Sequence, residues 1–243
     1  MTAAIRLTEI TKSFGTERVL DGISLEVPAG SVYALLGTNG AGKTTTISIL
    51  TTLLRADSGT ATVAGHDVAT APAAVREAIS MTGQNVTVDL VLTGLENLVL
   101  IGRLRHVSGP RGVASELIER FGLAAAANKP TATYSGGMKR RLDIAMSLIG
   151  SPEVVFLDEP TTGLDPAGRR EVWDTVAGLA SSGTTIMLTT QYMEEAAHLA
   201  DTIAVLAGGR IAASGSHDDI LDVAGAADLE SAFLALTAEG AHR

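Results

Sequence analysis

The stretch Gly37-Thr38-Asn39-Gly40-Ala41-Gly42-Lys43-Thr44 decides how this chain folds. It matches the pattern G-x-x-x-x-G-K-[ST] in full, with the apolar run Ser31 to Leu36 before it and a helical pattern from about Gly42 to Leu54 after it. Glycines let a backbone wrap closely around phosphate oxygens, and the helix that follows directs its positive N-terminal end at the same anion. The stretch therefore predicts a strand, a phosphate-binding loop and a helix in succession, with ATP as the ligand.

Two side chains of this loop are expected to act on the nucleotide. Lys43 supplies a fixed cation for the β- and γ-phosphates, and the Thr44 hydroxyl is placed to ligate magnesium. The alternative for the loop taken alone is a glycine-rich turn before an ordinary helix, which the motifs further along the chain argue against. The residues expected to contact ATP here are Gly37, Thr38, Asn39, Gly40, Ala41, Gly42, Lys43, Thr44 and Thr45.

A pair of carboxylates follows a second apolar run. Val154 to Leu157 reads as a buried strand, and Asp158 and Glu159 come directly after it. Such a strand carries its last residues to the carboxyl edge of the sheet, where α/β folds place ligands. Because adjacent strand residues point to opposite sides, Asp158 is expected to partner magnesium and Glu159 to be the general base that polarises the attacking water. The alternative is a solvated acidic turn.

Composition narrows the function classes. The chain has 243 residues, which fits one large α/β domain or a core that carries a smaller subdomain. A net charge of -9 and an aromatic content of 3% argue against a general nucleic-acid binder, although Lys139-Arg140-Arg141 is a candidate local basic patch. The absence of cysteine excludes disulfides, iron–sulfur clusters and thiol catalysis, and the scattered histidines argue against a metal or redox enzyme.

No membrane segment is expected. The longest apolar runs are far shorter than the roughly 20 residues that span a bilayer, and the N-terminus lacks a signal-peptide pattern. If the protein works at a membrane, we expect it to do so through a partner.

The pattern along the chain predicts an insertion. Strand-like and helix-like runs alternate up to about residue 87 and again from about residue 150, whereas the stretch from about Leu92 to Ala127 shows helical spacing alone. We therefore predict an α/β core formed by residues 1–87 and 150–243, with a helical subdomain at 88–149. The remaining expected strands are Ile5–Phe14, Val19–Val27, Thr60–Val68 with a break at Gly65, Thr184–Thr189, Thr202–Leu206 and Arg210–Ser214, and the segment Ile79–Gly83 is expected to lead into a loop. The remaining expected helices are Pro72–Ala78, one that follows Ser135-Gly136-Gly137 and runs to Leu148, Ala167–Ala180, Met193–Ala200 and Asp218 to about Thr237.

Further motifs carry a family resemblance. Tyr134-Ser135-Gly136-Gly137-Met138 resembles the LSGGQ signature of ABC-type ATPases, and the segment from Pro160 to Pro166, with Asp165, resembles their D-loop. Gln84 looks like the Q-loop glutamine, and Phe14 looks like the aromatic that stacks on adenine. Taken alone, Ser135 would be an ordinary helix N-cap, Phe14 a core or strand-edge residue and Gln84 a surface-loop residue. In order, the motifs span nearly the whole chain.

The resemblance implies a fold and an assembly. Members have a P-loop NTPase core in which helices flank a mixed sheet, with an N-terminal antiparallel β subdomain and an inserted helical subdomain. Their dimer is head-to-tail, so Ser135, Gly136, Gly137 and Asp165 would act on the nucleotide held by a second ATPase subunit, a homodimer partner or a close relative. Gln84 would help to position magnesium and the attacking water.

One position departs from that pattern. The family places a histidine about 30 residues after the catalytic glutamate, and here Gln191 occupies that position. Its amide can hydrogen-bond a γ-phosphate oxygen or the attacking water, but it cannot ionise. The segment from Thr189 to Ala196, and the segment from Leu92 to Leu98, resemble the daunorubicin-resistance-type branch.

That branch contains exporter ATPases paired with separate permeases. It implies a cytoplasmic subunit held on the inner face of the cell membrane by a permease, which powers export of a drug-like or lipid-like substrate. We expect Asn85 to Asn97 to contact the permease. The alternative is a non-transport ABC-type ATPase, although such proteins usually show paired cassettes, a long coiled coil or zinc-type cysteines.

Overall fold

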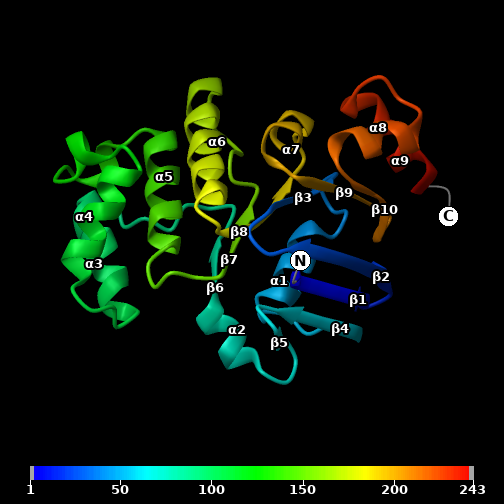
Figure 1. Cartoon of the computed structure of the whole chain (residues 1–243), viewed down its shortest axis with the longest axis horizontal. Helices are drawn as coiled ribbons and strands as arrows, with labels where there is room; N and C mark the ends of the chain where they lie inside the picture. The colour runs from blue at the N-terminus through cyan, green and yellow to red at the C-terminus, as the bar shows by residue number, and fades with distance from the viewer. Residues whose placement is uncertain (1–2, 241–243) are drawn as a thin grey trace.

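The computed structural model describes residues 3–240, with only the backbone described at 239 and 240. Strand β3 (Val32–Gly37) lies inside a six-stranded sheet of order β10-β9-β3-β8-β7-β6 (Figure 1). Its neighbours β8 (Thr185–Thr190) and β9 (Thr202–Ala207) run parallel to it. Parallel pairing continues to β7 (Val154–Asp158) and β6 (Ile79–Thr82), while β10 (Arg210–Gly215) is antiparallel at the opposite edge.

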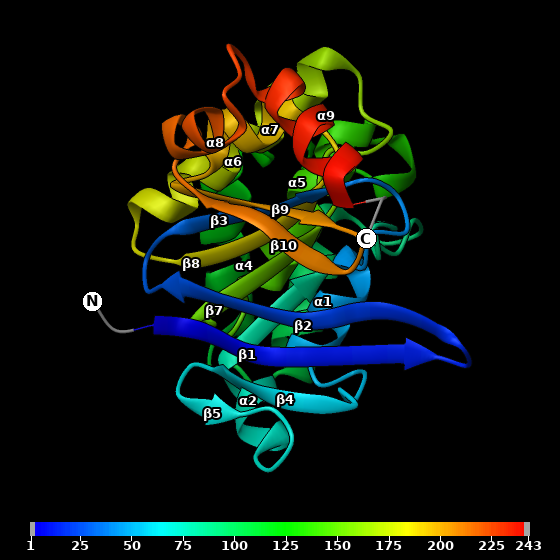
Figure 2. The same cartoon turned by 90° about the vertical axis from the view of Figure 1, so that its right-hand side faces the viewer.

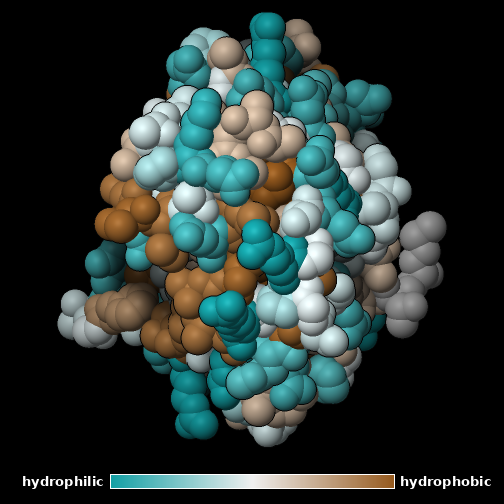
Figure 3. Space-filling view, turned by 90° about the vertical axis from the view of Figure 1, so that its left-hand side faces the viewer, coloured by the Kyte–Doolittle hydropathy of each residue, from teal (hydrophilic) through white to brown (hydrophobic). Residues whose placement is uncertain are grey.

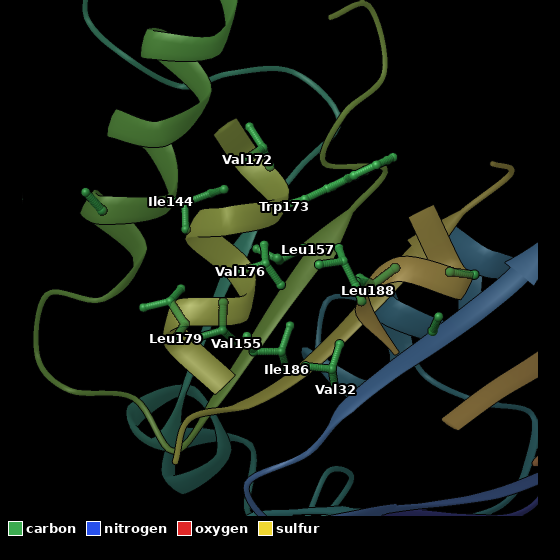
Figure 4. Close-up of a cluster of buried hydrophobic side chains, with 14 of the residues drawn as sticks. Val32, Ile144, Val155, Leu157, Val172, Trp173, Val176, Leu179, Ile186 and Leu188 are labelled. Carbon is green, nitrogen blue, oxygen red and sulfur yellow. The ribbon is translucent and has the colours of Figure 1, made fainter. Parts of the chain in front are cut away.

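Both faces of this sheet are buried, which explains the unbroken apolar runs in its strands. In β3, Val32, Ala34 and Leu36 join one apolar cluster, and Tyr33 and Leu35 join another on the opposite face. On the first face, side chains of β7, β8 and β3 pack against Val172, Trp173, Val176 and Leu179 of helix α6 (Pro166–Ser181) (Figure 4).

A second sheet lies beneath the other face. Strands β1 (Ala3–Phe14) and β2 (Glu17–Pro28) form a long hairpin, and β4 (Ser58–Val63) and β5 (His66–Asp67) extend it into a four-stranded antiparallel sheet (Figure 2). Helix α1 (Lys43–Leu50) packs between the two sheets through Ile47, Ile49 and Leu50. Helix α2 (Pro72–Ala78) joins β5 to β6.

The segment between β6 and β7 is helical. It contains α3 (Gly94–Leu104), α4 (Pro110–Arg120), α5 (Gly136–Ser147) and two short 3-10 turns, Ala124–Ala126 and Thr131–Thr133. Thr93 and Glu96 form a capping box that fixes the start of α3. The three helices lie together at one end of the molecule (Figure 1). Helices α7 (Met193–Leu199), α8 (His217–Ala224) and α9 (Leu229–Gly240) complete the chain.

The fold class predicted from the sequence is confirmed, with three local corrections. The helix expected to reach Leu54 ends at Leu50, because Thr52 adopts a left-handed backbone with φ of 64°. The segment from Ile79, expected to lead into a loop, forms edge strand β6 by pairing with β7. The C-terminal helical stretch is divided in two at Gly225, which caps α8 with φ of 61°.

Helix α7 carries a buried carboxyl group. Glu195 is 0% exposed, and the indole Nε1 of Trp173 donates a hydrogen bond to its Oε1 at 3.2 Å. Within the described residues, Oε2 is buried without a hydrogen-bond partner. Burial raises the pKa of Glu195, and the nearby hydroxyls of Thr190 and Thr161, the bond from Trp173 and the charge of Arg140 offset this only in part.

This raised pKa gives a stability prediction with a definite sign. The folded state holds the proton more tightly than the unfolded state, so the stabilisation from this group is complete below the unfolded pKa and is lost as the pH rises through the folded one. Glu195→Gln, which stays neutral, should raise the unfolding temperature by about 2–4 °C at pH 8, and by less near pH 5. Thermal scans across this range test it. A difference between variant and parent that shrinks with rising pH would contradict it.

Candidate active site

The predicted phosphate-binding loop connects β3 to α1. Gly40 and Gly42 have φ of 82° and 108°, a region that side chains other than glycine rarely adopt. A Cβ atom at Gly42 would also lie 2.6 Å from the Leu20 side chain, so β2 leaves no room for one. The sequence thus needs glycine at this position for the backbone path and for packing. Among the other loop residues, Thr38, Asn39 and Gly40 are exposed, Ala41 is buried and Thr45 is partly buried.

The Lys43 side chain turns back along this loop. Its Nζ donates to the carbonyl oxygens of Gly37 at 2.9 Å and Thr38 at 3.0 Å, and lies 3.4 Å from Glu159 Oε1. Lys43 is almost fully buried, and a buried ammonium requires such partners. Together these contacts hold a positive charge at the centre of the loop.

The carboxylate of Asp158 lies beside Thr44. The Thr44 hydroxyl donates to Asp158 Oδ2 at 3.2 Å, although 114 residues separate the two in sequence. Thr189, at the end of β8, donates to Asp158 Oδ1. Because β8 lies between β3 and β7 in the sheet, it brings this hydroxyl between the loop and the carboxylate. The result is a group of oxygen ligands of the kind that Mg²⁺ prefers.

Glu159 follows the end of β7 in an unusual backbone conformation. Its φ is 48°, in the left-handed region. Its amide nitrogen donates to the carbonyl and hydroxyl oxygens of Thr189, both at 3.1 Å. Its Oε2 accepts hydrogen bonds from the Gln84 amide at 3.2 Å and the Thr162 hydroxyl at 3.1 Å. Lysine, amide and hydroxyl groups from separate segments therefore converge on this one carboxylate.

The residues predicted for the second half of the site lie elsewhere. Ser135 caps α5, with its hydroxyl accepting from Met138 N at 3.2 Å, and Asp165 caps α6 by accepting from Gly168 N at 2.8 Å. A Cβ at Gly137 would lie 3.1 Å from Gly168 Cα, so these two helix N-termini pack closely. Among the described residues, no side-chain hydrogen bond joins this group to the predicted phosphate loop. Gly136 belongs to the same group, where a Cβ would lie 3.1 Å from Leu164.

Among the described residues, neither Phe14 nor Gln191 makes a side-chain hydrogen bond to the cluster. Phe14 ends β1, is 50% exposed, and has the Lys12 amine 5.6 Å from its ring centre. An exposed ring at this position is free to stack on a planar ligand. Gln191 is partly buried in the short connection between β8 and α7.

Sequence reasoning missed three contributors. Thr189 and Thr162 hydrogen-bond the two carboxylates, and Arg140 donates to backbone carbonyls beside them. The expected basic patch at 139–141 is wrong, because Arg140 is buried against Asp143 and Arg141 pairs with Glu171. Two features of the sequence could have indicated them: Thr189 stands near the end of the apolar run of β8, and Arg140 is a charged residue within the apolar pattern of α5.

Comparison with known proteins agrees with this geometry. A family model described as "ABC transporter" matches residues 20–162, more than half of the chain. The daunorubicin/doxorubicin resistance ATP-binding protein DrrA of Streptomyces peucetius is 54% identical over 221 residues, which cover 90% of this chain and 67% of that protein. The doxorubicin resistance ATP-binding protein DrrA of Mycobacterium tuberculosis is 48% identical over 226 residues, covering 91% and 68%.

A solved structure shows the same likeness in three dimensions. The ATP-binding subunit of an ABC transporter superposes with a TM-score of 0.84 at 27% identity, covering 97% of this chain and all of that one. The family match, the relatives and the converged loop and carboxylates point the same way. The chain belongs to the ABC transporter family, as an ATP-binding and ATP-hydrolysing component.

Proposed function

We propose that this ATPase powers the export of a drug-like or lipid-like molecule through a separate membrane permease. The observation that carries the proposal is the 54% identity to a daunorubicin/doxorubicin resistance ATP-binding protein over 90% of the chain. Within residues 3–240, none of the helices combines the length and the apolar character that a membrane span requires. A permease of several hydrophobic spans would form the pathway, and this subunit would sit on the inner face of the cell membrane against it.

Hydrolysis follows from the cluster at the sheet edge. Lys43 and the loop from Gly37 to Thr45 would hold the phosphates, and Thr44, Asp158 and Gln84 would hold Mg²⁺. When bound, the metal would supply positive charge that offsets the negative charge of the phosphates. Glu159 accepts the proton of the attacking water, and Gln84 and Thr162 orient its carboxylate. Gln191 contributes an amide hydrogen bond in place of imidazole, so the proton falls to Glu159.

A complete site needs two chains in this proposal. Ser135, Gly136 and Gly137 at the N-terminus of α5, together with Asp165, complete the site of a second ATPase subunit, and Phe14 stacks on adenine. The exposed position of the α5 N-terminus supports this, since a helix N-terminus attracts an anion. The division into a core (1–87 and 150–243) and a helical subdomain (88–149) supplies the parts that move against each other when ATP closes the pair.

The permease contact is proposed at the segment from Asn85 to Asn97. Here Leu90 is 50% and Val91 is 85% exposed. The loop that carries them is anchored by hydrogen bonds from Asn97 and Thr131 to the backbone of Asp89. Exposed apolar side chains on a fixed loop are typical of a protein interface. Figure 3 shows hydrophobic surface gathered on this side of the molecule, near α3, where Leu100 and Leu104 are also exposed.

The alternative is a non-transport ABC-type ATPase. No specific feature of the described residues favours this alternative. Co-purification distinguishes a transporter subunit from a non-transport ATPase. A protein with several hydrophobic spans should accompany the tagged chain from membranes. Recovery of the chain with ribosomes or DNA alone would favour the alternative.

Lys43→Ala should weaken ATP binding by roughly tenfold or more, because it removes a charged hydrogen-bond donor from the phosphates. Titration with a fluorescent ATP analogue measures the dissociation constant. Lys129→Ala, which removes an exposed lysine outside the site, is the matched control. Equal affinity in both variants would remove Lys43 from the phosphate site.

Glu159→Gln should lower ATP turnover by about 100-fold or more while retaining ATP affinity, since an amide cannot act as a general base. The variant should also accumulate an ATP-dependent dimer in light scattering. Glu153→Gln changes an exposed carboxylate just before β7, at the opposite end of the strand, and is the control. Near-normal turnover would remove Glu159 as the base, and a monomer with bound ATP would contradict the two-chain site.

Leu90→Ser combined with Val91→Ser should abolish permease co-purification and lower drug efflux by about tenfold, because it removes apolar contact area from the interface. Basal ATP hydrolysis should stay within about twofold of the parent, since neither side chain touches the catalytic cluster. Val223→Ser, an exposed apolar residue on α8 at the other end of the molecule, is the control (Figure 1). Unchanged efflux and co-purification would place the permease contact elsewhere.

A further inference from the structure

Arg140 occupies an exceptional position on α5. It lies in the second turn of the helix that begins after Ser135, and it is only 2% exposed. Arginine is almost never fully buried unless its charge and all its donors are paired. Burial lowers the pKa of the Arg140 guanidinium, and the carboxylate of Asp143 opposes that effect. Burying this charge costs free energy, so the contacts of the guanidinium indicate the role of Arg140.

Those contacts enclose the proposed base. Arg140 Nη2 donates to the carbonyl oxygen of Asp158 at 3.2 Å, and Nε donates to the carbonyl oxygen of Pro160 at 2.7 Å. These are the residues immediately before and after Glu159. A planar guanidinium has its donors in a fixed fork, so binding two carbonyls sets the backbone between them.

The backbone between these carbonyls needs such support. Glu159 has φ of 48°, a conformation that costs energy for a residue with a Cβ and persists only where its surroundings enforce it. Thr189 accepts from the Glu159 amide on one side of the turn. Arg140 holds the carbonyls on the other. With both sides fixed, the Glu159 side chain points toward Lys43 and Gln84.

The same guanidinium reaches the segment that carries Gln84. Its Nη1 donates to the carbonyl oxygen of Gly83 at 2.8 Å and to Asp143 Oδ2 at 3.1 Å. Asp143 Oδ1 in turn accepts from the amide and hydroxyl of Thr87, at 3.2 and 2.7 Å. Arg140 and Asp143 therefore fix the chain on both sides of Gln84, whose amide hydrogen-bonds Glu159.

We propose that Arg140 is a positioning residue for ATP hydrolysis: it holds the Glu159 backbone in its left-handed turn and aligns the Gln84 segment with the Glu159 carboxylate. This inference rests on the proposed role of Glu159 as the base. A purely structural role, in which Arg140 only cross-links α5 to the core, would change stability without a selective change in turnover. The two roles therefore predict different kinetics.

The test compares Arg140→Lys with Arg141→Lys in the full chain. Lysine keeps the charge at position 140 but loses the fork that reaches several carbonyls at once. Arg141, the next residue, bonds the Phe121 carbonyl and Glu171 outside the catalytic cluster, so it is a matched control. Steady-state ATPase kinetics, ATP affinity and unfolding temperature are measured for both.

Arg140→Lys should lower kcat about 10-fold to 100-fold, as a small misplacement of a reacting group does. KM and ATP affinity should stay within about twofold, and Arg141→Lys should keep kcat within about twofold of the parent. The proposal is overturned if kcat of Arg140→Lys stays within twofold of the parent value, or if KM changes in place of kcat. It is also overturned if Arg141→Lys loses as much turnover as Arg140→Lys.

A second variant decides the matter if Arg140→Lys does not fold. In the parent, one carboxylate oxygen of Asp143 accepts from Arg140 and the other accepts from Thr87. Asparagine has only one acceptor oxygen, so Asp143→Asn loses one of these two hydrogen bonds. It should lower kcat about tenfold at unchanged ATP affinity. Full kcat in a folded Asp143→Asn would sink the proposal. Glu159→Gln tests the role of the base separately. If Glu159→Gln loses turnover while Arg140→Lys keeps the parent kcat, the role of Arg140 is refuted and the role of Glu159 stands.

Discussion

Parallel strands end at the same edge of their sheet, and the site depends on this one constraint. The predicted phosphate loop follows β3, Thr189 lies near the end of β8, Asp158 ends β7 and Glu159 follows it. The order β3-β8-β7 therefore brings three distant segments together. Lys43 and Glu159 are both nearly buried here and stand 3.4 Å apart. Two charges in such a place are tolerated only when each is paired and further hydrogen-bonded, which is what the loop carbonyls, Gln84 and Thr162 provide.

The two buried faces of the sheet make that edge stiff. Alternate residues of β3 enter separate apolar clusters, one beneath α6 and one above α1. A shift of the strand by one residue would therefore move every side chain to the opposite face of the sheet. A stiff scaffold matters because hydrolysis needs the base and the phosphate held in place before the nucleotide reacts. The strained turn at Glu159 is therefore supported by a part of the protein that has little freedom to move.

Sequence reasoning reached the fold class and most of the elements, since these rest on local signals. Glycine spacing predicted a phosphate site in the loop between β3 and α1, and an apolar run with two acids predicted the end of β7. It missed Thr189, Thr162 and Arg140, because their importance lies in partners 18 to 57 positions away or in a turn that only the fold defines. It also extended α1 to Leu54, because helical propensity does not reveal that Thr52 turns left-handed. The strand at Ile79 needed the edge of β7 to pair with, which no local pattern contains.

Helix α5 connects the two halves of the proposed site. Its N-terminus carries Ser135 and Gly137, which are proposed to meet the nucleotide of a second subunit, and its second turn carries Arg140, which hydrogen-bonds the backbone on both sides of Glu159, the proposed base of its own chain. A helix is stiff over so short a distance, so a movement of its N-terminus also moves the guanidinium. Contact of the α5 N-terminus with the partner's nucleotide would then shift the position of Glu159 in the chain that carries this helix. The two ATP sites of a pair would thus be coupled through α5 as well as through the interface itself.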